Sequence, residues 1–402
     1  MSKEFAANSA VRVAVAGAGA FGQNHLRVYR ELETAGAGVQ LVAAVEPDAA
    51  RAAECSAKFG IPVFSTTNEL LRSNVKVDAA SVAVPTVYHH ATAAELLDSG
   101  LDVLVEKPIA ASLSQADELI AHAEAKKCIL QPGHLERFNP AVLAVEPNLR
   151  RPMFFEAHRL SVFTPRSLDV DVVLDLMIHD LDIVLTFAHS PVREVRAVGL
   201  PILSPKVDIA NVRVEFESGC VANFTASRVS TERVRKLRFF EPRQYVSIDY
   251  ARRDVLVIRV DENGNGMKPA DLIAALPEGV RAMLPKHIVD GLNSGAIDLK
   301  TLDPKVVSQF ASMAKIDPAV IAQLTGQSEA KAGLSFSKPE IQSGEPLKLE
   351  IESFLESVRT RRTPHVTAQQ GRNALALALE IQARMAAHAE RAGLQSFFET
   401  GA

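Results

Sequence analysis

The 402-residue chain contains no tryptophan, four tyrosines and three cysteines. The cysteines Cys55, Cys128 and Cys220 form no C-x-x-C pair and no Cys/His metal spacing. A small, odd number of scattered cysteines is typical of a protein from a reducing compartment, and we therefore expect a cytoplasmic protein. No run of eighteen apolar residues is present, so the sequence predicts no transmembrane helix.

An excess of charge of either sign is also missing. The formal net charge is −4, with 23% charged and 47% hydrophobic residues. This balance gives no support for binding to nucleic acid or to a membrane surface. The length is typical of two domains with a sizeable core.

A glycine-rich turn follows the first apolar run. The stretch VRVAVAGAGAFGQNHL has the order strand, turn, helix, and it carries G-x-G-x-x-G at Gly17, Gly19 and Gly22, with Ala20 and Phe21 inside the motif. Gly17 permits a tight turn, Gly19 lets the backbone approach a pyrophosphate, and Gly22 allows close packing of helix on strand. The start of the helix then offers free N–H groups to phosphates. The motif predicts a dinucleotide site.

The second predicted strand, VQLVAAVEPD, ends in an acid that bears on the cofactor. Glu46 lies about 24 residues beyond Gly22, near the place of a ribose-binding carboxylate. A carboxylate there repels the extra phosphate of NADP, which favours NAD. Arg51 keeps NADP open, because a nearby arginine could meet that phosphate.

Strand and helix patterns alternate up to residue 133. Such alternation predicts an α/β Rossmann domain over 1–133, with a doubly wound parallel sheet whose ligands lie at the carboxyl ends of the strands. Polar groups stand at those predicted ends: Pro85, Thr86, Glu106, Lys107 and His134. Lys107 in the sequence EKP is either a solvated lysine at a strand end or a lysine in the cofactor crevice. In the crevice it could stabilise negative charge on a substrate oxygen.

Strand-like runs dominate the second part of the chain, 134–402. We expect an α+β domain with an open, mostly antiparallel sheet, whose free face would form a homodimer or homotetramer. Residues 262–340 look like a helical insertion of unassigned role. Residues 371–392 look like a final helix that could pack back on the first domain.

The stretch DLMIHDLDIVL, residues 175–185, predicts an apolar helix that carries polar groups. At about 100° per residue, Asp175, His179 and Asp182 share one sector. At i and i+4, Asp175 could orient the His179 ring and stabilise its protonated form. The alternatives are a buried polar network without chemistry and a metal site, but no HExxH or cysteine pair supports a metal. Asp180 lies about 140° from Asp175 and would meet solvent, a strand arginine or a neighbouring subunit.

Two further stretches carry polar side chains that could bind a substrate. In GHLERFNP these are His134, Arg137 and Asn139, and the alternative is a linking loop in which Glu136 and Arg137 pair locally. SRVSTERVRKLRFF holds five Arg and Lys residues. It predicts a solvated strand pair or, less favoured, a track for the two phosphates of a nucleotide sugar.

Five stretches together resemble one family: GAGAFGQNH, PTVYHH, EKP, DLMIHDLD and TAQQGRNALALALEIQ. They are similar to the glucose–fructose oxidoreductase / inositol dehydrogenase / MocA family over about 10–260 and 345–390. PGHLERFNPAV is similar to a narrower group that contains UDP-N-acetylglucosamine 3-dehydrogenases. The family's usual acid at the end of the second strand is aspartate, and here it is Glu46.

The resemblance implies NAD(P)-dependent oxidation of a sugar or cyclitol hydroxyl. It implies Lys107 as a catalytic lysine, Asp175 and His179 as the pair of the D-x-x-x-H motif, and His89 of PTVYHH beside the cofactor. His179 could take the hydroxyl proton and Lys107 could steady the oxyanion, while NAD accepts the hydride. The favoured substrate is UDP-N-acetylglucosamine, oxidised at C3. The alternatives are a free sugar or cyclitol, and a non-catalytic NAD(P)-binding regulator, which should lack the lysine or the D-x-x-x-H pair.

Overall fold

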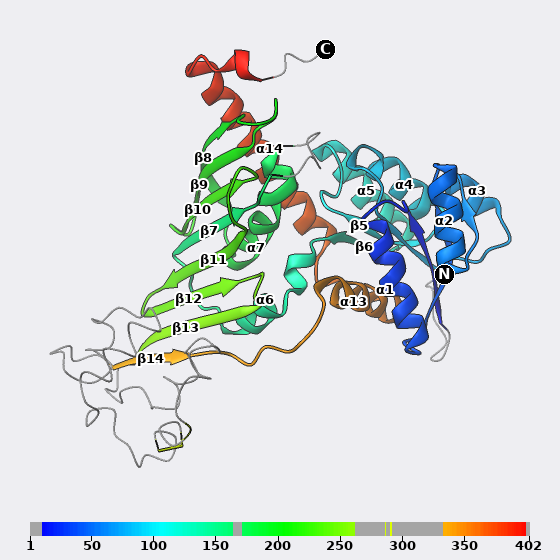
Figure 1. The fold of residues 1–402 in the computed structure, drawn as a ribbon, viewed down its shortest axis with the longest axis horizontal. Helices are drawn as coiled ribbons and strands as arrows, with labels where there is room; N and C mark the ends of the chain where they lie inside the picture. The colour runs from blue at the N-terminus through cyan, green and yellow to red at the C-terminus, as the bar shows by residue number, and fades with distance from the viewer. Residues whose placement is uncertain (1–9, 164–170, 262–285, 287–289, 292–332, 399–402) are drawn as a thin grey trace.

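A computed structural model of the chain describes residues 10–163, 171–261, 286, 290–291 and 333–398, and these residues build two sheets (Figure 1). The first sheet is parallel and six-stranded, in the order β3-β2-β1-β4-β5-β6. This order confirms the predicted doubly wound Rossmann fold. Its strands are β1 (Val11–Ala16), β2 (Val39–Val45), β3 (Val63–Phe64), β4 (Ala79–Val82), β5 (Asp102–Glu106) and β6 (Leu130–Gly133).

Helices connect these strands and cover both faces of the sheet. Side-chain caps set where they begin: Asp48, Thr66 and Ser112 each accept a backbone N–H of the first turn. The helices are α1 (Gly22–Thr34), α2 (Ala49–Phe59), α3 (Thr67–Arg72), α4 (His89–Asp98) and α5 (Leu113–Lys126), with a 3₁₀ turn at Thr86–Tyr88.

A helix from the far end of the chain completes the first domain. α13 (Pro346–Thr360) lies beside α1 in Figure 1. Its apolar side chains Ile351, Phe354 and Val358 belong to the same buried cluster as Leu26 of α1. A segment far beyond the boundary predicted at 133/134 thus contributes to the first core, because the chain returns to it near its end.

The second sheet has eight strands in the order β14-β13-β12-β11-β7-β10-β9-β8. Every pair is antiparallel except β7 with β10, which confirms the predicted mostly antiparallel sheet. The strands are β7 (Phe154–Leu160), β8 (Val192–Leu200), β9 (Ile209–Phe216), β10 (Val221–Ser227), β11 (Val234–Glu241), β12 (Gln244–Asp249), β13 (Asp254–Asp261) and β14 (Gly333–Ser337).

Strand β14 corrects the end of the helical insertion that was expected over 262–340. Residues 333–337 pair with β13 as an edge strand. Their sequence GLSFS alternates apolar and polar residues, the two-residue period of a strand, which the breaks on either side obscured. Most of the remaining insertion lies outside the described residues.

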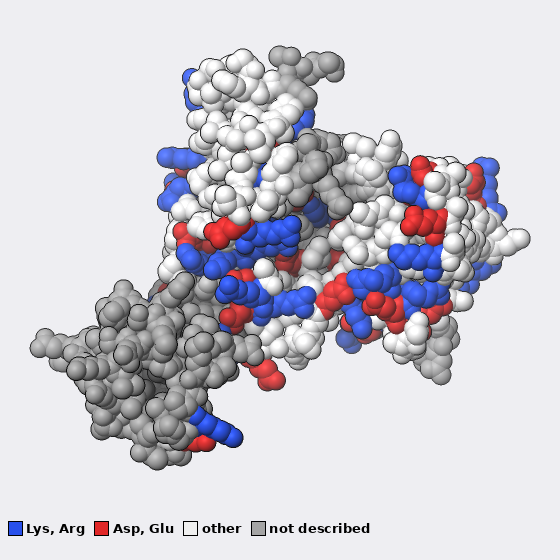
Figure 2. All heavy atoms as spheres, in the orientation of Figure 1, with Lys and Arg blue, Asp and Glu red and all other residues white. Residues whose placement is uncertain are grey.

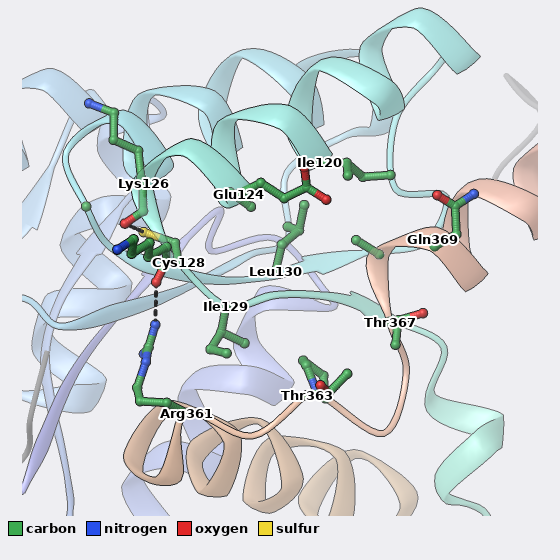
Figure 3. A pocket seen from close by; sticks show the side chains of 15 residues that line it. Ile120, Glu124, Lys126, Cys128, Ile129, Leu130, Arg361, Thr363, Thr367 and Gln369 are labelled. Atoms are coloured by element: carbon green, nitrogen blue, oxygen red, sulfur yellow. Dashed lines mark hydrogen bonds between the residues drawn. The ribbon is translucent and has the colours of Figure 1, made fainter. Parts of the chain in front are cut away.

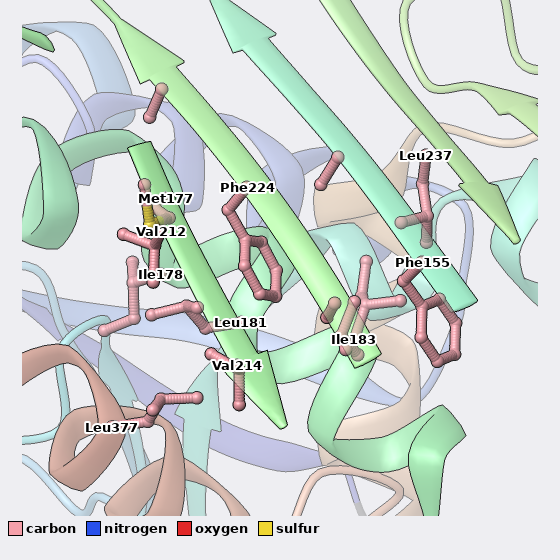
Figure 4. Close-up of a cluster of buried hydrophobic side chains, with 14 of the residues drawn as sticks. Phe155, Met177, Ile178, Leu181, Ile183, Val212, Val214, Phe224, Leu237 and Leu377 are labelled. Atoms are coloured by element: carbon pink, nitrogen blue, oxygen red, sulfur yellow. The ribbon is translucent and has the colours of Figure 1, made fainter. Parts of the chain in front are cut away.

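One face of the second sheet packs on helices, and Figure 4 shows this core. Alternate residues of β9, among them Val212 and Val214, are buried against Ile178 and Leu181 of α7 and Leu377 of α14. No described element covers the opposite face in Figure 1. The helices of this part are α6 (Pro140–Val145), a π-helical turn at Val173–Met177, α7 (Ile178–Ala188) and α14 (Ala368–Arg391), with 3₁₀ turns at Leu135–Phe138, Glu146–Asn148 and Gln395–Phe397.

α14 links the two domains, as expected for the final helix. It packs on β8 and α7, and near its start it meets β6 of the first sheet. A Cβ placed on Gly371 would lie 2.5 Å from Cγ of Pro132, so the helix packs closely on β6 at this glycine.

Within the described residues, no helix is long and apolar enough to span a membrane.

Candidate active site

The glycine turn after β1 has the geometry of a phosphate-binding loop. Gly17 has φ of 93°, and a Cβ there would lie 2.6 Å from the carbonyl oxygen of Ala83. A Cβ on Gly22 would lie 1.8 Å from the carbonyl oxygen of Gly17. A Cβ on Gly19 would meet no atom within 4 Å, so the backbone there is open to a ligand. The three positions thus fit the dinucleotide motif.

Glu46, at the end of β2, is held against this turn. Its carboxylate accepts the backbone N–H of Ala18 at 3.0 Å and that of Asp48 at 3.0 Å. It also accepts the Arg51 guanidinium at 2.9 Å. Burial acts to raise the pKa of Glu46, but these hydrogen bonds together lower it. Glu46 is therefore a fixed negative charge, and Arg51 is bound to it.

Other predicted cofactor contacts gather where β1 and β4 end. Ala20, Phe21 and Pro85 are exposed there, and Thr86 is half-buried. His89 is buried instead, and its two ring nitrogens face the carbonyl oxygens of Pro108 at 2.7 Å and Val84 at 2.9 Å. In this structure His89 holds the two loops together, and its contact with a cofactor stays a prediction.

Glu106, at the end of β5, is also turned inward. It is 8% exposed, and its carboxylate lies 2.9 Å from Nε2 of the buried His25 on α1. A Cβ on Gly133 would lie 2.8 Å from the same carboxylate. Glu106 therefore ties the end of β5 to α1, and its contact with a cofactor stays a prediction.

Lys107 reaches across to the second domain. Its Nζ donates to the carbonyl oxygen of Asp175 at 2.7 Å and, more weakly, to that of Leu174 at 3.4 Å. Both carbonyls belong to the π-helical turn at Val173–Met177. A π turn bonds residue i to i+5 and changes the direction of its carbonyls, and such turns are frequent at functional sites. Loss of hydration lowers the pKa of Lys107, although Asp175 acts to raise it.

His179 lies just beyond that turn, in α7. Burial lowers its pKa well below the usual value, and the positive charges of Lys107 and then Arg159 lower it further. The imidazole is therefore neutral at neutral pH and can accept a proton. Its Nδ1 is buried and has no hydrogen-bond partner among the described residues. No hydrogen bond joins the Asp175 carboxylate to this ring among the described residues, so the predicted orienting contact is not made in this structure.

The second carboxylate of the helix, Asp180, binds a strand arginine, one of the alternatives left open by the sequence. Arg159 of β7 is 3% exposed. Its Nε donates to Asp180 at 2.7 Å, its Nη2 to the other oxygen of Asp180 at 3.0 Å, and its Nη1 to Glu136 at 3.0 Å. The guanidinium also stacks over the Tyr250 ring at 5.1 Å. This cluster fixes α7 on the sheet beside His179.

His134 and Asp182 meet in the interior. His134 is 1% exposed, and its Nδ1 lies 3.9 Å from a carboxylate oxygen of Asp182. Burial lowers the pKa of His134, although Asp182 acts to raise it. His134 is therefore a neutral ring at neutral pH, and its contact with a substrate stays a prediction.

Arg137 and Asn139 are buried and bound by protein groups, and their contact with a substrate stays a prediction. Arg137 is 2% exposed and donates to the Thr186 hydroxyl at 2.6 Å. Asn139 caps α6 and donates to Glu136 at 3.0 Å. The alternative of a local Glu136–Arg137 pair is also wrong, since Glu136 binds Arg159 instead. Both side chains link structural elements, because the loop runs through the domain junction.

The surface is hollowed between the two domains, as Figure 2 shows, and Lys and Arg side chains gather along the hollow on the side of the second sheet. A separate cavity of about 740 Å³ lies between α5, β6 and residues 361–369 (Figure 3). Arg361 faces that cavity but is bound by Asp102 and by the carbonyl of Lys127. None of the predicted site residues lines it. The candidate active site is therefore the junction of the domains.

Comparison with known families agrees with this geometry. Residues 11–134 match an oxidoreductase family with an NAD-binding Rossmann fold, Gfo/Idh/MocA, and residues 142–242 match the C-terminal domain of the same family. The chain belongs to the Gfo/Idh/MocA family. It is an NAD(P)-dependent oxidoreductase that acts on CH–OH groups.

Relatives within the Gfo/Idh/MocA family show how far the likeness extends. A UDP-N-acetylglucosamine 3-dehydrogenase from Acidithiobacillus ferrooxidans is 29% identical over 95% of this chain and 99% of that protein. A solved structure of that enzyme has a TM-score of 0.72 and 28% identity, covering 94% of this chain and 97% of that one. A scyllo-inositol 2-dehydrogenase (NAD(+)) from Bacillus subtilis is 26% identical over 55% of this chain and 68% of that protein.

A more distant member gives the fold alone. The WlbA dehydrogenase from Chromobacterium violaceum, solved in complex with NADH and UDP-GlcNAcA, has a TM-score of 0.68 at 14% identity, covering 96% of each chain.

Within the described part of this chain, no group of three or more His, Cys, Asp or Glu side chains could hold a metal ion.

Sequence reasoning missed some of the residues that build this Gfo/Idh/MocA site. Arg159 was not singled out, although alternation in FFEAHRL puts it on the same face as Phe155 and Ala157. A cation on a buried face needs a carboxylate partner. The position of Arg159 in the sequence could therefore have predicted its pairing with Asp180. The His25–Glu106 pair had no comparable signal, since the two residues are far apart in the sequence.

Proposed function

We propose that this chain uses NAD to oxidise the 3-hydroxyl of UDP-N-acetylglucosamine to a 3-keto nucleotide sugar. The similarity to a relative with that activity, which runs over nearly the whole chain, supports the substrate. The arrangement of Lys107 and His179 at the domain junction supports the chemistry.

His179 takes the hydroxyl proton in this mechanism. Its neutral ring is a base at neutral pH, because burial and the charge of Lys107 both disfavour the imidazolium. When the proton leaves, negative charge develops on the substrate oxygen. The bound NAD supplies the acceptor for the hydride from the same carbon.

Lys107 stabilises the developing oxyanion. An ammonium has three N–H donors, and two of them point to the carbonyl oxygens of Asp175 and Leu174. The third donor is left for the substrate oxygen, in a direction set by the π turn. Such preorganised donors stabilise the transition state without reorganising during the reaction.

NAD is the preferred cofactor in this proposal. Gly19 leaves room for a pyrophosphate, and Glu46 places a fixed negative charge at the end of β2. Arg51 is already paired with Glu46, so it does not offer a free cation to the phosphate of NADP. The carboxylate would bind ribose hydroxyls instead.

The chemistry of the product indicates the class of enzyme that would consume it. A 3-keto nucleotide sugar is a substrate for an aminotransferase, as in the synthesis of lipid A-type amino sugars. We propose this place in metabolism for a cytoplasmic enzyme. We also propose that it works as a homodimer or homotetramer through the uncovered face of the second sheet.

A substrate panel tests the proposal. Purified full-length protein with NAD should form NADH, read by absorbance, with UDP-N-acetylglucosamine and at lower rates with other UDP-sugars. His179→Ala and Lys107→Ala should lose at least ~100-fold in turnover while NAD still binds, the usual scale for a general base or an oxyanion donor. Absence of turnover with every UDP-sugar would overturn the substrate class.

A free sugar or cyclitol is the second candidate. The likeness to the scyllo-inositol enzyme, over about half the chain, favours it. N-acetylglucosamine and inositols therefore belong in the same panel, and faster turnover with one of them would replace the first proposal. A non-catalytic regulator is disfavoured, since Lys107, Asp175 and His179 are all retained.

A further inference from the structure

Arg235, on β11, lies on the side of the sheet that faces the active site. β11 is antiparallel to β7, and Arg235 pairs in register with Arg159. Side chains alternate along a strand, so Arg235 shares a face with Leu237 and Phe239, which are fully buried in the core under α7. Arg235 itself sits at the start of the strand, where this face opens to solvent.

Arg159 and Arg235, which face each other across the two strands, differ in their ion-pair partners. Arg159 is bound by Asp180 and Glu136. Arg235 has no ion-pair or hydrogen-bond partner for its guanidinium among the described residues. Like charges directly opposite one another in a sheet are unfavourable. Partial burial and the charge of Arg159 accordingly lower the pKa of Arg235, which marks a cation that an anion would stabilise.

Arg235 is close enough to act on the reacting group. Its charge is one of those that lower the pKa of His179, together with Lys107 and Arg159. The geometry agrees, since Arg235 lies directly opposite Arg159, and Arg159 binds Asp180, the residue that follows His179 in α7. Arg159 is already bound by carboxylates, and Lys107 is directed by two backbone carbonyls toward the reacting oxygen, which leaves Arg235 as a cation for another group of the ligand.

We propose that Arg235 is an anion-binding residue of the active site that holds the diphosphate of the nucleotide-sugar substrate. This inference rests on the proposed function. A guanidinium forms two parallel hydrogen bonds with phosphate oxygens, and such charge-assisted pairs are among the stronger ones. Free sugars and cyclitols carry no charge, so a cation at this place selects for a phosphorylated substrate.

The same strand provides a matched control. Arg238 is also on β11, but it lies on the opposite face and its Nη1 donates to Glu156 at 3.1 Å. Arg235→Gln and Arg238→Gln thus remove the same charge from the two faces of one strand. Both side chains reach solvent, so both variants should unfold at the same urea concentration as the parent protein.

UDP is the probe, and its binding to the NAD-loaded full chain is measured by calorimetry. The parent and Arg238→Gln should bind UDP alike. Arg235→Gln should bind it ~10- to 100-fold more weakly, the scale of a hydrogen bond to a charged group. Arg235→Lys should recover part of the loss, since it restores charge without the fork. NAD affinity should be the same in all four proteins.

Turnover separates this inference from the proposed function. With UDP-N-acetylglucosamine, Arg235→Gln should raise KM with a smaller change in kcat, and removal of its charge should move the acidic limb of the pH profile to higher pH. If UDP binds through Arg235 but UDP-N-acetylglucosamine is not oxidised, the subsite stands and the substrate assignment fails. If the parent does not bind UDP, or Arg235→Gln binds it as the parent does, the subsite is refuted.

Discussion

The buried pair of Arg159 and Asp180 is the feature on which the position of His179 depends, and we expect Asp180→Ala to destabilise the protein strongly. Asp180 is 2% exposed and accepts two hydrogen bonds from the guanidinium, at 2.7 Å and 3.0 Å. Its removal leaves a buried cation with Glu136 as its remaining carboxylate partner. Water cannot easily replace the lost carboxylate, because Arg159 is itself 3% exposed.

The size of the effect depends on that burial. Removing one partner of a buried ion pair costs about 3–5 kcal/mol, because the other charge stays uncompensated. Asp180→Asn should cost less, about 1–3 kcal/mol, since it keeps an acceptor for one of the two bonds. The triple variant Arg159→Met, Asp180→Leu, Glu136→Gln should regain most of the loss, because it removes the buried charges together.

Urea unfolding followed by circular dichroism measures these differences. The control is Glu194→Ala, which removes the carboxylate of the exposed pair with Arg196 and should leave the unfolding midpoint unchanged. A loss below about 1 kcal/mol in Asp180→Ala, or a triple variant weaker than Asp180→Ala alone, would refute the reasoning that the unpaired charge sets the cost.

Other predictions concern the cofactor loop and the proton-handling groups. Gly19→Ala should unfold like the parent, because a Cβ meets nothing within 4 Å, yet it should weaken NAD binding measured by fluorescence titration. Glu46→Gln should raise the preference for NADP over NAD ~10- to 100-fold in kcat/KM, since the charge that repels the extra phosphate is gone. Asp175→Asn should keep Lys107 in place, because the lysine binds the backbone carbonyl, but it should lower the lysine pKa. The alkaline limb of the pH–rate profile should then move to lower pH, and turnover near neutral pH should fall less than in Lys107→Ala. Folding lowers the pKa of His179, so below about pH 6.5 the unfolded chain binds a proton that the folded chain does not. The free energy of unfolding should therefore fall as the pH drops below about 6.5, and it should fall less steeply in His179→Asn.

Local patterns were sufficient for much of the fold. G-x-G-x-x-G, the acid at Glu46 and the β/α alternation each rest on short-range chemistry, and the parallel sheet could be predicted from them. Contacts between distant segments carry no such pattern. α13, residues 346–360, packs into the first core, but its amphipathic pattern alone does not predict which of the two sheets it covers.

The same limit divides the polar side chains of the candidate site. Lys107 and His179 could be named because their motifs are local. Arg137 and Asn139 looked equally suited to a ligand, yet they are buried, since whether a loop residue faces solvent or the domain junction is decided by the packing of both domains.

The π turn at Val173–Met177 shows why the sequence could identify the residues of this site but not their contacts. A regular α-helix would keep the carbonyls of Leu174 and Asp175 in its own hydrogen-bond ladder. The inserted turn instead turns those carbonyls to Lys107, which crosses from the first domain to bind them. His179 is then left with a buried Nδ1 that no described residue binds. The helix thus anchors the lysine through its backbone and leaves the histidine ring available to the substrate, which is the arrangement that a base and an oxyanion donor require.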